Sequence, residues 1–457
     1  MTITSKSLWL SGVLSRRNIL RLGTACAFGL PGEASAQSQS NWSSRAAGTE
    51  LEAKPAPVEP TTIREFLAAR IPTRQGVEIF LDPSQPNWAQ FDPELGYTLR
   101  GNVIKDGVDG SRSITSYEKT GERTKVNYAH KPCRISAYGD SFTLSQQVSD
   151  GETWEEVLAA HLGEPIRNFG IGGYGTYQAY RRMLRQEASS SASKYLILNV
   201  WDLDDYLRSI DSWRWLRMGQ RELSRPYHGH RYTFHGNPWV HARLDLNTGA
   251  LVEKPNLFAT KDSLYQLADL DFVYRHFKDD LVVQLLAARE GATDVDRDML
   301  EKVAKALGVN ADISSVEATS QTAQAIHIEY GLRVGTKVIE KARDFARDQG
   351  KQLLILLSFG RTAVAHACAG RPRFDQSVLD FLKKENLLFV DTLEKHQADF
   401  KMFNLSPDEY VKLYYVGHYN PRGNLFFAFA IKDAVVNWLD PKPVAYRQGS
   451  ETIPAVS

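Results

Sequence analysis

The fold is decided by a short strand and the turn that follows it, Ile135-Ser136-Ala137-Tyr138-Gly139-Asp140-Ser141. A helix should begin soon afterwards, because Thr153-Trp154-Glu155-Glu156 has the residue order of a capping box. A second strand over 166–169 leads into a glycine-rich turn, and a third over 195–201 is almost wholly apolar. Apolar strands of this kind are typical of parallel sheets that helices cover on both faces. The sequence therefore predicts a repeated unit of strand, turn and helix.

The same pattern returns later in the chain. Strands are expected over 353–357 and 388–390, and a last helix over 421–439. The predicted fold class is therefore α/β, a flavodoxin-like three-layer doubly wound parallel sheet whose two halves are residues 131–211 and 326–440.

Other segments interrupt or flank this sheet. Residues 212–325 form a long insertion, first aromatic and then helical, in which Asn247-Thr248-Gly249 marks a hairpin turn. Residues 61–130 are rich in turn residues and predict an irregular, partly β lead-in. Residues 37–60 have the composition of a linker, and residues 441–457 form a C-terminal tail.

Residues 1–36 are typical of an export signal. Arg16 and Arg17 precede a weakly apolar stretch over 22–30, and Ala34-Ser35-Ala36 supplies the small residues of a cleavage site. The paired arginines indicate the twin-arginine route. We therefore expect a periplasmic or secreted protein from which the signal has been removed.

Composition excludes several classes of protein. Of the 457 residues, 42% are hydrophobic and 24% charged, which is ordinary globular composition and not that of a disordered chain. A net charge of +1 provides no general field for nucleic acid or anionic membranes. No run of 18 apolar residues occurs, so we expect no membrane span. Cys133 and Cys368 are expected to be two buried thiols, although a single disulfide is possible in an oxidising compartment. The oligomeric state stays open.

Ser141 is the first candidate for a chemical role. In a parallel α/β sheet, a residue just beyond a strand's carboxyl end and at a helix entrance lies in the crevice where ligands bind. Its hydroxyl would stand near backbone N–H groups that favour a developing negative charge, as an acyl-transfer nucleophile requires. The alternative is a serine that only caps the helix.

Ser141 lies in the first of three segments that, in this order, resemble the SGNH/GDSL hydrolase superfamily. The segments are Tyr138-Gly139-Asp140-Ser141-Phe142-Thr143, Asn168-Phe169-Gly170-Ile171-Gly172-Gly173-Tyr174-Gly175-Thr176 and Gly417-His418-Tyr419-Asn420-Pro421-Arg422-Gly423-Asn424. The resemblance covers about residues 95–205 and 330–440 and implies an SGNH hydrolase fold. It also implies that Ser141 is the nucleophile and His418 its base, and that Gly173 and Ser141 offer backbone N–H groups to the oxyanion. It implies no cofactor.

Two positions depart from the family pattern. The family usually has an Asn that donates a side-chain hydrogen bond to the oxyanion, and Asp204 stands at that place. Either Asp204 is protonated or turned away, or another amide serves. The family also has an Asp two or three residues before the catalytic His, where this chain has Val416 and Tyr415. Asp391 or Asp408 could orient the imidazole instead, or a Ser-His dyad could work with a backbone carbonyl holding the ring.

Other clusters have interpretations of their own. The carboxylates of Asp202, Asp204 and Asp205 could serve a glycosidase or hold a divalent cation, or they could simply begin a helix. Four histidines of the insertion fit no zinc pattern well, so no metal site is predicted. They are His228, His230, His235 and His241.

Two groups of large side chains can also be interpreted in more than one way. The aromatic residues of the insertion could stack on sugar rings or form its own small core. Arg181, Arg182 and Arg185 follow the glycine-rich turn, and their spacing predicts one solvated helix face.

The predicted function is that of an exported serine esterase, acting through an acyl-enzyme on Ser141 with His418 as base. Its substrate would be a small or polymeric acylated molecule, a carbohydrate above all, with acetyl as the favoured group. An O-acyltransferase acting on an envelope glycan could use the same Ser-His pair. The sequence leaves two further functions open: a glycan-binding protein with a degenerate site, and a glycosidase working through the carboxylates of Asp202 to Asp205.

Overall fold

The computed structural model describes residues 61–85, 88–218 and 237–447, all of which belong to one compact unit. The predicted export signal and linker lie outside the described residues, as does the end of the predicted tail. His228, His230 and His235 also lie outside them.

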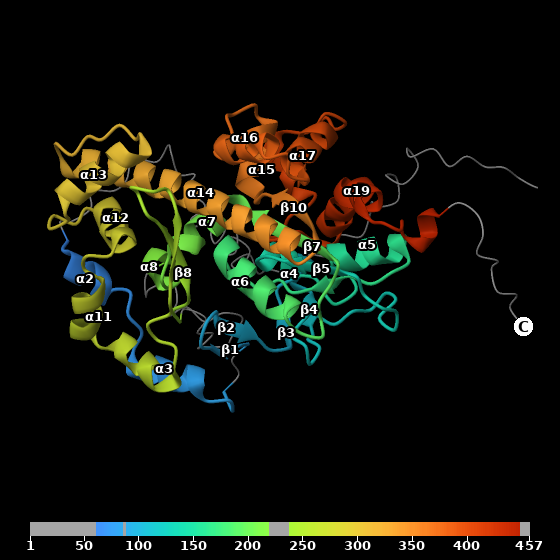
Figure 1. Ribbon diagram of the computed structural model, residues 1–457, viewed down its shortest axis with the longest axis horizontal. Helices are drawn as coiled ribbons and strands as arrows, with labels where there is room; N and C mark the ends of the chain where they lie inside the picture. The colour runs from blue at the N-terminus through green and yellow to red at the C-terminus, as the bar shows by residue number, and fades with distance from the viewer. Residues whose placement is uncertain (1–60, 86–87, 219–236, 448–457) are drawn as a thin grey trace, which may run out of the picture. The chain divides into compact units, whose positions relative to one another are not determined.

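The centre of the structure is a sheet of five parallel strands, as the sequence predicts (Figure 1). In chain order the strands are β5 (Ile135–Tyr138), β6 (Arg167–Asn168), β7 (Tyr195–Trp201), β10 (Gln352–Ser358) and β11 (Phe389–Asp391). They lie side by side in the order β11-β10-β7-β5-β6. Read from β6 and numbered along the chain, this order is 2-1-3-4-5, a common order of doubly wound α/β sheets. The predicted α/β class and parallel sheet are confirmed.

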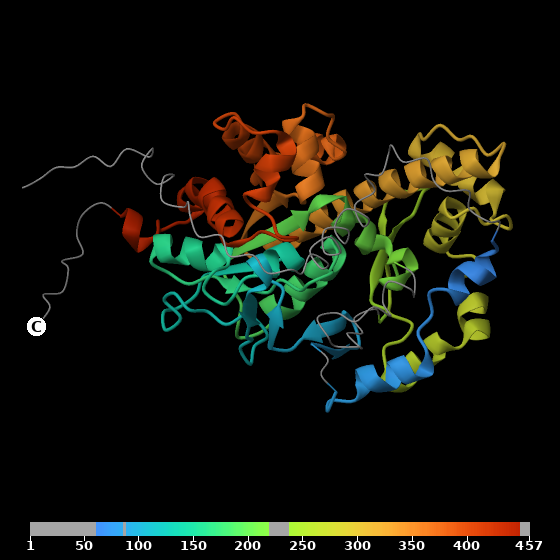
Figure 2. The ribbon, with the colours of Figure 1, turned by 180° about the vertical axis from the view of Figure 1, so that it is seen from behind.

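Helices cover both faces of the sheet. The chain moves from β5 to β6 in one direction and from β6 to β7 and β10 in the other, so right-handed crossovers place the connecting helices on opposite faces. On one face α5 (Trp154–Leu162) packs against the last helix, α19 (Pro421–Trp438) (Figure 2). On the other lie α6 (Thr176–Glu187) and α14 (Val316–Asp348). The arrangement is compatible with the three predicted layers.

Shorter helices complete the second half of the sheet domain. They are α15 (Arg361–Cys368), α16 (Gln376–Lys384), α17 (Thr392–Phe400) and α18 (Pro407–Lys412). Of these, α17 packs on β10 and α19, and α18 packs on α15. The loop between α18 and α19 carries His418.

The lead-in is more helical than predicted. It begins with α2 (Ile63–Ala68) and α3 (Arg74–Leu81), and two antiparallel hairpins follow. The hairpins pair β1 (Ala89–Asp92) with β2 (Gly96–Leu99), and β3 (Asn102–Lys105) with β4 (Arg112–Thr115). Thr62 forms a capping box with Glu65 at the start of α2. The β prediction is therefore correct for the two hairpins and wrong for the residues before them.

The insertion joins the sheet domain through α7 (Asp202–Ile210) and α14. Between them lie α8 (Trp215–Met218), the hairpin of β8 (His241–Leu244) and β9 (Leu251–Lys254), α10 (Lys261–Leu264), α11 (Leu270–Phe277), α12 (Leu281–Arg289) and α13 (Arg297–Leu307). The predicted turn at 247–249 lies between β8 and β9, as expected. α14 runs unbroken for 33 residues across the predicted boundary at 325. Gly335 lets it approach α7, because a Cβ there would lie 2.2 Å from Cδ1 of Tyr206.

The described tryptophans of the insertion belong to its core. Trp213, Trp215 and Trp239 are all buried. Trp213 packs edge-on against Phe277 of α11, with ring centroids 4.9 Å apart. These rings therefore stabilise the insertion and offer no surface for stacking on a sugar.

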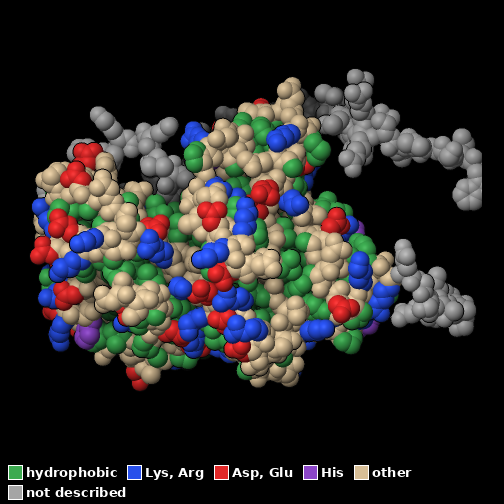
Figure 3. All heavy atoms as spheres, turned by 45° about the horizontal axis from the view of Figure 1, so that its top comes forward, with side chains coloured by type: hydrophobic (Ala, Val, Ile, Leu, Met, Phe, Trp, Pro, Cys, Tyr) green, Lys and Arg blue, Asp and Glu red, His purple; other side chains and the backbone are tan. Residues whose placement is uncertain are grey.

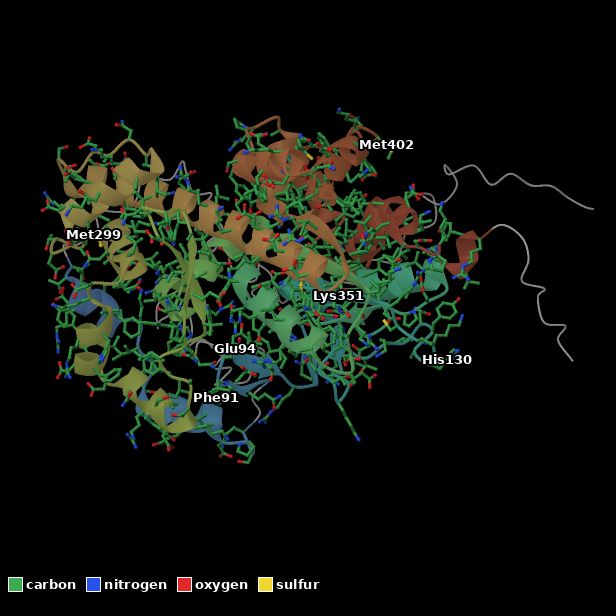
Figure 4. All side chains as sticks on the ribbon, viewed as in Figure 1. Phe91, Glu94, His130, Met299, Lys351 and Met402 are labelled. Carbon is green, nitrogen blue, oxygen red and sulfur yellow. The ribbon has the colours of Figure 1, made fainter. Side chains whose placement is uncertain are left out.

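The predicted solvated face of α6 is only partly correct, because Arg185 is exposed and Arg181 half-buried, whereas Arg182 is buried. Arg181 and Arg185 both form ion pairs with Glu94, at 2.7 Å and 2.8 Å, and Figure 4 labels Glu94 beside this helix. Arg182 is buried and donates to the carbonyl of Gly121 at 2.6 Å. The loop between β1 and β2 thus covers this part of α6, which the spacing of the arginines alone could not indicate.

Basic and acidic side chains are interspersed on the face shown in Figure 3. Along the described ranges, no helix is long and apolar enough to cross a membrane. Cys133 and Cys368 are free thiols, as predicted, but each is half-buried and not buried.

Candidate active site

Ser141 lies at the carboxyl end of β5, where the strand order reverses. β5 ends at Tyr138, and Ser141 opens the single helical turn α4 (Ser141–Leu144) with Asp140 as its N-cap (Figure 1). Because β6 and β7 lie on the two sides of β5, this end of the sheet is a topological switch point, where doubly wound folds bind ligands. Ser141 therefore stands at a strand end and a helix entrance, as the sequence indicates.

The Ser141 hydroxyl donates to the neighbouring carboxylate. Its Oγ lies 3.2 Å from Oδ2 of Asp140, while Oδ1 accepts from the N–H of Phe142 at 2.8 Å. Burial raises the pKa of Asp140 to about 6, and Arg208, with Nη1 3.8 Å from Oδ2, opposes that rise. Ser141 is 7% exposed. A reacting Ser141 must turn its hydroxyl from Asp140 towards a base.

His418 is held by Gln147, a residue that belongs to none of the three family segments. Oε1 of Gln147 accepts from the backbone N–H of His418 at 2.7 Å and lies 3.0 Å from its Nδ1. Nε2 of Gln147 donates to the carbonyl of Asp106 at 2.9 Å, which fixes which end of the amide faces the ring. Since Oε1 can only accept, Nδ1 must carry the proton. The lone pair is therefore on Nε2, as a general base requires.

The imidazole lies beside the turn that carries Ser141. Its ring centroid is 5.0 Å from that of Phe142, the residue after Ser141. No hydrogen bond joins Ser141 to His418 in the described structure. Burial first, and then the charges of Arg208 and Arg214, lower the pKa of His418 to about 3. The ring is therefore neutral at neutral pH.

Two backbone donors are available near Ser141. Within the described part of the chain, neither the N–H of Ser141 nor that of Gly173 donates a hydrogen bond. The turn containing Gly173 contacts the nucleophile, since a Cβ on Gly172 would lie 3.7 Å from the Cβ of Ser141. These donors are the two that the resemblance assigns to the oxyanion.

Asp204 has no such role. Its carboxylate is 1% exposed and accepts from Arg208 and Arg217, each at 2.8 Å. Burial alone would raise its pKa, but the two guanidinium groups outweigh burial and the pKa lies below the ordinary value. An ionised carboxylate has no hydrogen to donate, so Asp204 cannot replace the family's Asn.

Asp391 is also engaged elsewhere. It caps α17 by accepting from the N–H of Leu393 at 2.9 Å, and its other oxygen pairs with Arg373. Asp408 is exposed in the first turn of α18. The orienting partner of His418 is therefore a neutral amide and neither of the predicted acids.

The other carboxylates after β7 are internal. Asp202 accepts from the N–H groups of Leu203 and Gly360, and Asp205 accepts from the N–H of Trp201. All three acids of the predicted cluster lie in the first turn of α7, where negative charge interacts favourably with the helix dipole and stabilises the helix.

No metal centre is evident in the described structure. Among its residues, no group of three or more His, Cys, Asp and Glu could hold a metal ion. His241, the described member of the predicted histidine group, has its Nδ1 3.3 Å from the carbonyl of Trp239.

A small pocket lies next to α4 and the β3–β4 hairpin. Its lining is mixed: Trp88, Leu99 and Leu144 are apolar, and Asn102, Asp106 and Gln147 are among its polar residues. Beside it, at one end of the sheet, lie a serine, an oriented neutral imidazole and two backbone donors, a set of groups that could carry out acyl transfer. No family model matches the chain, and a search of curated proteins finds no relative.

Proposed function

We propose that this protein is a serine esterase of the SGNH/GDSL type, exported by the twin-arginine route to the periplasm or the cell exterior. One observation carries the proposal: Gln147 orients the imidazole of His418 beside the turn of Ser141, with the lone pair on Nε2. The strand order and the resemblance of the three segments support the same assignment.

The reaction begins when Oγ of Ser141 attacks the ester carbonyl carbon. Its proton passes to Nε2 of His418, and the carbonyl oxygen becomes an oxyanion that accepts from the N–H groups of Gly173 and Ser141. Collapse of this intermediate breaks the bond to the leaving alkoxide, which takes the proton from Nε2. Water then attacks the acyl-enzyme by the same two steps and releases the free acid.

A neutral amide can orient the ring without adding charge. Papain-like sites use a Cys-His-Asn set in the same way. Gln147 keeps the proton on Nδ1, so His418 presents the same face to Ser141 before and after each transfer. The dyad of Ser141 and His418 thus needs no acid for its geometry.

The favoured acyl group is acetyl, as the resemblance to the SGNH/GDSL hydrolases implies. The alcohol part would be a carbohydrate or another polymer outside the cytoplasm. A glycosidase is disfavoured, because the carboxylates of Asp202, Asp204 and Asp205 are committed to backbone N–H groups and arginines.

The test uses 4-nitrophenyl acetate and a fluorophosphonate probe on the chain without residues 1–36. We expect turnover and labelling by the wild type, and Ser141→Ala should lose both. The exposed residues Ser189 and His130 provide matched controls, since Ser189→Ala and His130→Ala should keep both (Figure 4 labels His130). A wild type that neither turns over the ester nor takes the label contradicts the proposal. Faster transfer to an added oligosaccharide than to water would identify an acyltransferase.

A further inference from the structure

Arg214 fills the space that a side chain at Gly173 would need. A Cβ on Gly173 would lie 1.9 Å from Nη1 of Arg214 and 2.7 Å from the hydroxyl of Tyr97. Gly173 also has a φ of +87°, which L side chains rarely adopt. The glycine therefore permits the turn and leaves room for a guanidinium against the backbone.

The guanidinium lies against the glycine turn that neighbours Ser141. Gly173 follows Gly172, which is within contact distance of Ser141, and the hydroxyl of Tyr97 donates to the Gly172 carbonyl at 2.6 Å. This bond fixes the two-glycine turn against which Ser141 and Arg214 both lie. The charge of Arg214 also reaches the imidazole, since it is one of the causes, after burial and Arg208, that lower the pKa of His418.

The neighbouring arginines are committed to acids. Arg208 and Arg217 each hold one oxygen of Asp204 at 2.8 Å, and Arg217 also pairs with Asp211. Arg214 lies against the hydroxyl of Tyr97 and the Cα of Gly173. Burial lowers the pKa of Arg214 to about 10, so the group stays protonated at neutral pH.

We infer that Arg214 is a catalytic residue that stabilises the oxyanion, in the place that the family gives to an Asn amide. The inference rests on the proposed esterase function. The guanidinium lies against the Cα of Gly173, whose N–H is one of the proposed oxyanion donors, so it would supply positive charge where the carbonyl oxygen becomes negative. A charged donor binds an oxyanion more strongly than a neutral amide does. The Asp204 anion, which would oppose this role, is neutralised by Arg208 and Arg217.

The first test is Arg214→Gln, which removes the charge and keeps an amide. We expect kcat on 4-nitrophenyl acetate to fall about 10²- to 10³-fold with KM little changed, as when one oxyanion donor is removed. Arg214→Lys keeps the charge but has fewer donors and should lose about tenfold. Arg181→Gln removes a guanidinium from the partly exposed face of α6 and should keep the wild-type kcat.

A second measurement separates catalysis from a structural role. An alkyl boronic acid adds the serine oxygen to boron, with the proton passing to His418, and forms a tetrahedral anion that resembles the intermediate. In Arg214→Gln its affinity should fall by the same factor as kcat/KM. In Arg214→Ala, added ethylguanidinium should restore part of the activity, whereas Ser141→Ala should gain nothing.

These measurements distinguish failure of the Arg214 inference from failure of the esterase assignment. A loss of kcat below about threefold in Arg214→Gln, or a large loss with unchanged boronic acid affinity, overturns the inference and leaves the esterase assignment intact. A wild type without any esterase activity or labelling defeats the esterase assignment itself. If Arg214→Gln has no cooperative thermal transition, Arg214→Lys decides: parallel losses of kcat and boronic acid affinity support the inference, and unchanged values overturn it.

Discussion

The two histidines nearest the end of the chain are held in opposite ways. His396 on α17 is fully buried, and its ring nitrogens face the hydroxyls of Tyr410 and Tyr419, each at 3.0 Å. His418 is half-buried, and its Nδ1 donates to Oε1 of Gln147. No residue in the described structure forms a hydrogen bond with Nε2 of His418.

The pKa does not distinguish them. Burial lowers the pKa of both rings to about 3, so both are neutral at pH 7. What differs is the number of ring nitrogens already hydrogen-bonded: two in His396 and one in His418. The neutral ring of His418 has one nitrogen without a hydrogen bond within the described structure, and this nitrogen can take a proton from a substrate or a serine. Both nitrogens of His396 are already hydrogen-bonded, so its role is structural.

Replacing each of the two histidines by alanine should change activity and stability in opposite proportions, and the activity loss in His418→Ala should exceed those in the Gln147 and Phe142 variants. His418→Ala should lower kcat/KM at least about 10⁴-fold, because the general base is lost, while the melting temperature changes little. His396→Ala should do the reverse, with a large fall in melting temperature and a smaller loss of activity in the folded fraction. Ester kinetics and thermal melts of both variants provide the check. Equal losses of activity at equal stability would show that the two rings do not differ in role.

Gln147 should have the next largest effect. Gln147→Ala releases the ring, and we expect kcat/KM to fall about 10²-fold from misplacement alone. Gln147→Glu puts a negative charge at Nδ1, which raises the pKa of His418. Because the protonated ring is not a base, the acid limb of kcat/KM should then move to higher pH than in the wild type. A limb that stays in place would mean that Gln147 does not face the reacting histidine.

The buried neutral ring of His396 should make the stability of the protein fall as the pH is lowered. The folded ring resists protonation down to about pH 3, whereas in the unfolded chain His takes up a proton below about pH 6.5. The unfolded state thus binds more protons, and the free energy of unfolding should fall by about 2 kcal/mol between pH 7 and pH 5 from His396 alone. Urea titrations of wild type and His396→Gln at both pH values measure this: the variant should lose less than the wild type.

The smallest effect should come from Phe142, which follows Ser141 in the chain and packs against His418. Its ring stacks on Trp201 at 4.7 Å and lies 5.0 Å from His418. Phe142→Leu keeps most of the volume and loses the ring contacts, so we expect about 1 kcal/mol less stability and a several-fold lower kcat. Wild-type values for both quantities would indicate that the aromatic contact does not position His418.

Local sequence patterns were enough to predict the elements that are buried along their whole length. β7 could be predicted because its seven residues are buried in a row, and the turn at Ser141 because it follows directly after β5. The short helix α2 was missed, since six residues form a helix mainly by packing on α11 and α12, far along the chain.

The site could be predicted only in part. Ser141, Gly173 and His418 belong to short motifs, and the structure brings them to one end of the sheet. Gln147 is different, because its role depends on a contact across 271 positions and on the Asp106 carbonyl that turns its amide. The role inferred for Arg214 likewise depends on its contact with the turn at Gly173, and no motif or spacing in the sequence predicts that contact.

The 33 residues of α14 would extend about 50 Å as one rod shared by the insertion and the sheet. One residue added to or removed from its middle would rotate everything beyond that point by about 100°. Gly335 would then no longer face Tyr206, and a backbone shaped for close approach would meet a bulkier neighbour. Insertions and deletions should therefore be tolerated in the 245–250 loop between β8 and β9, and not in the middle of α14.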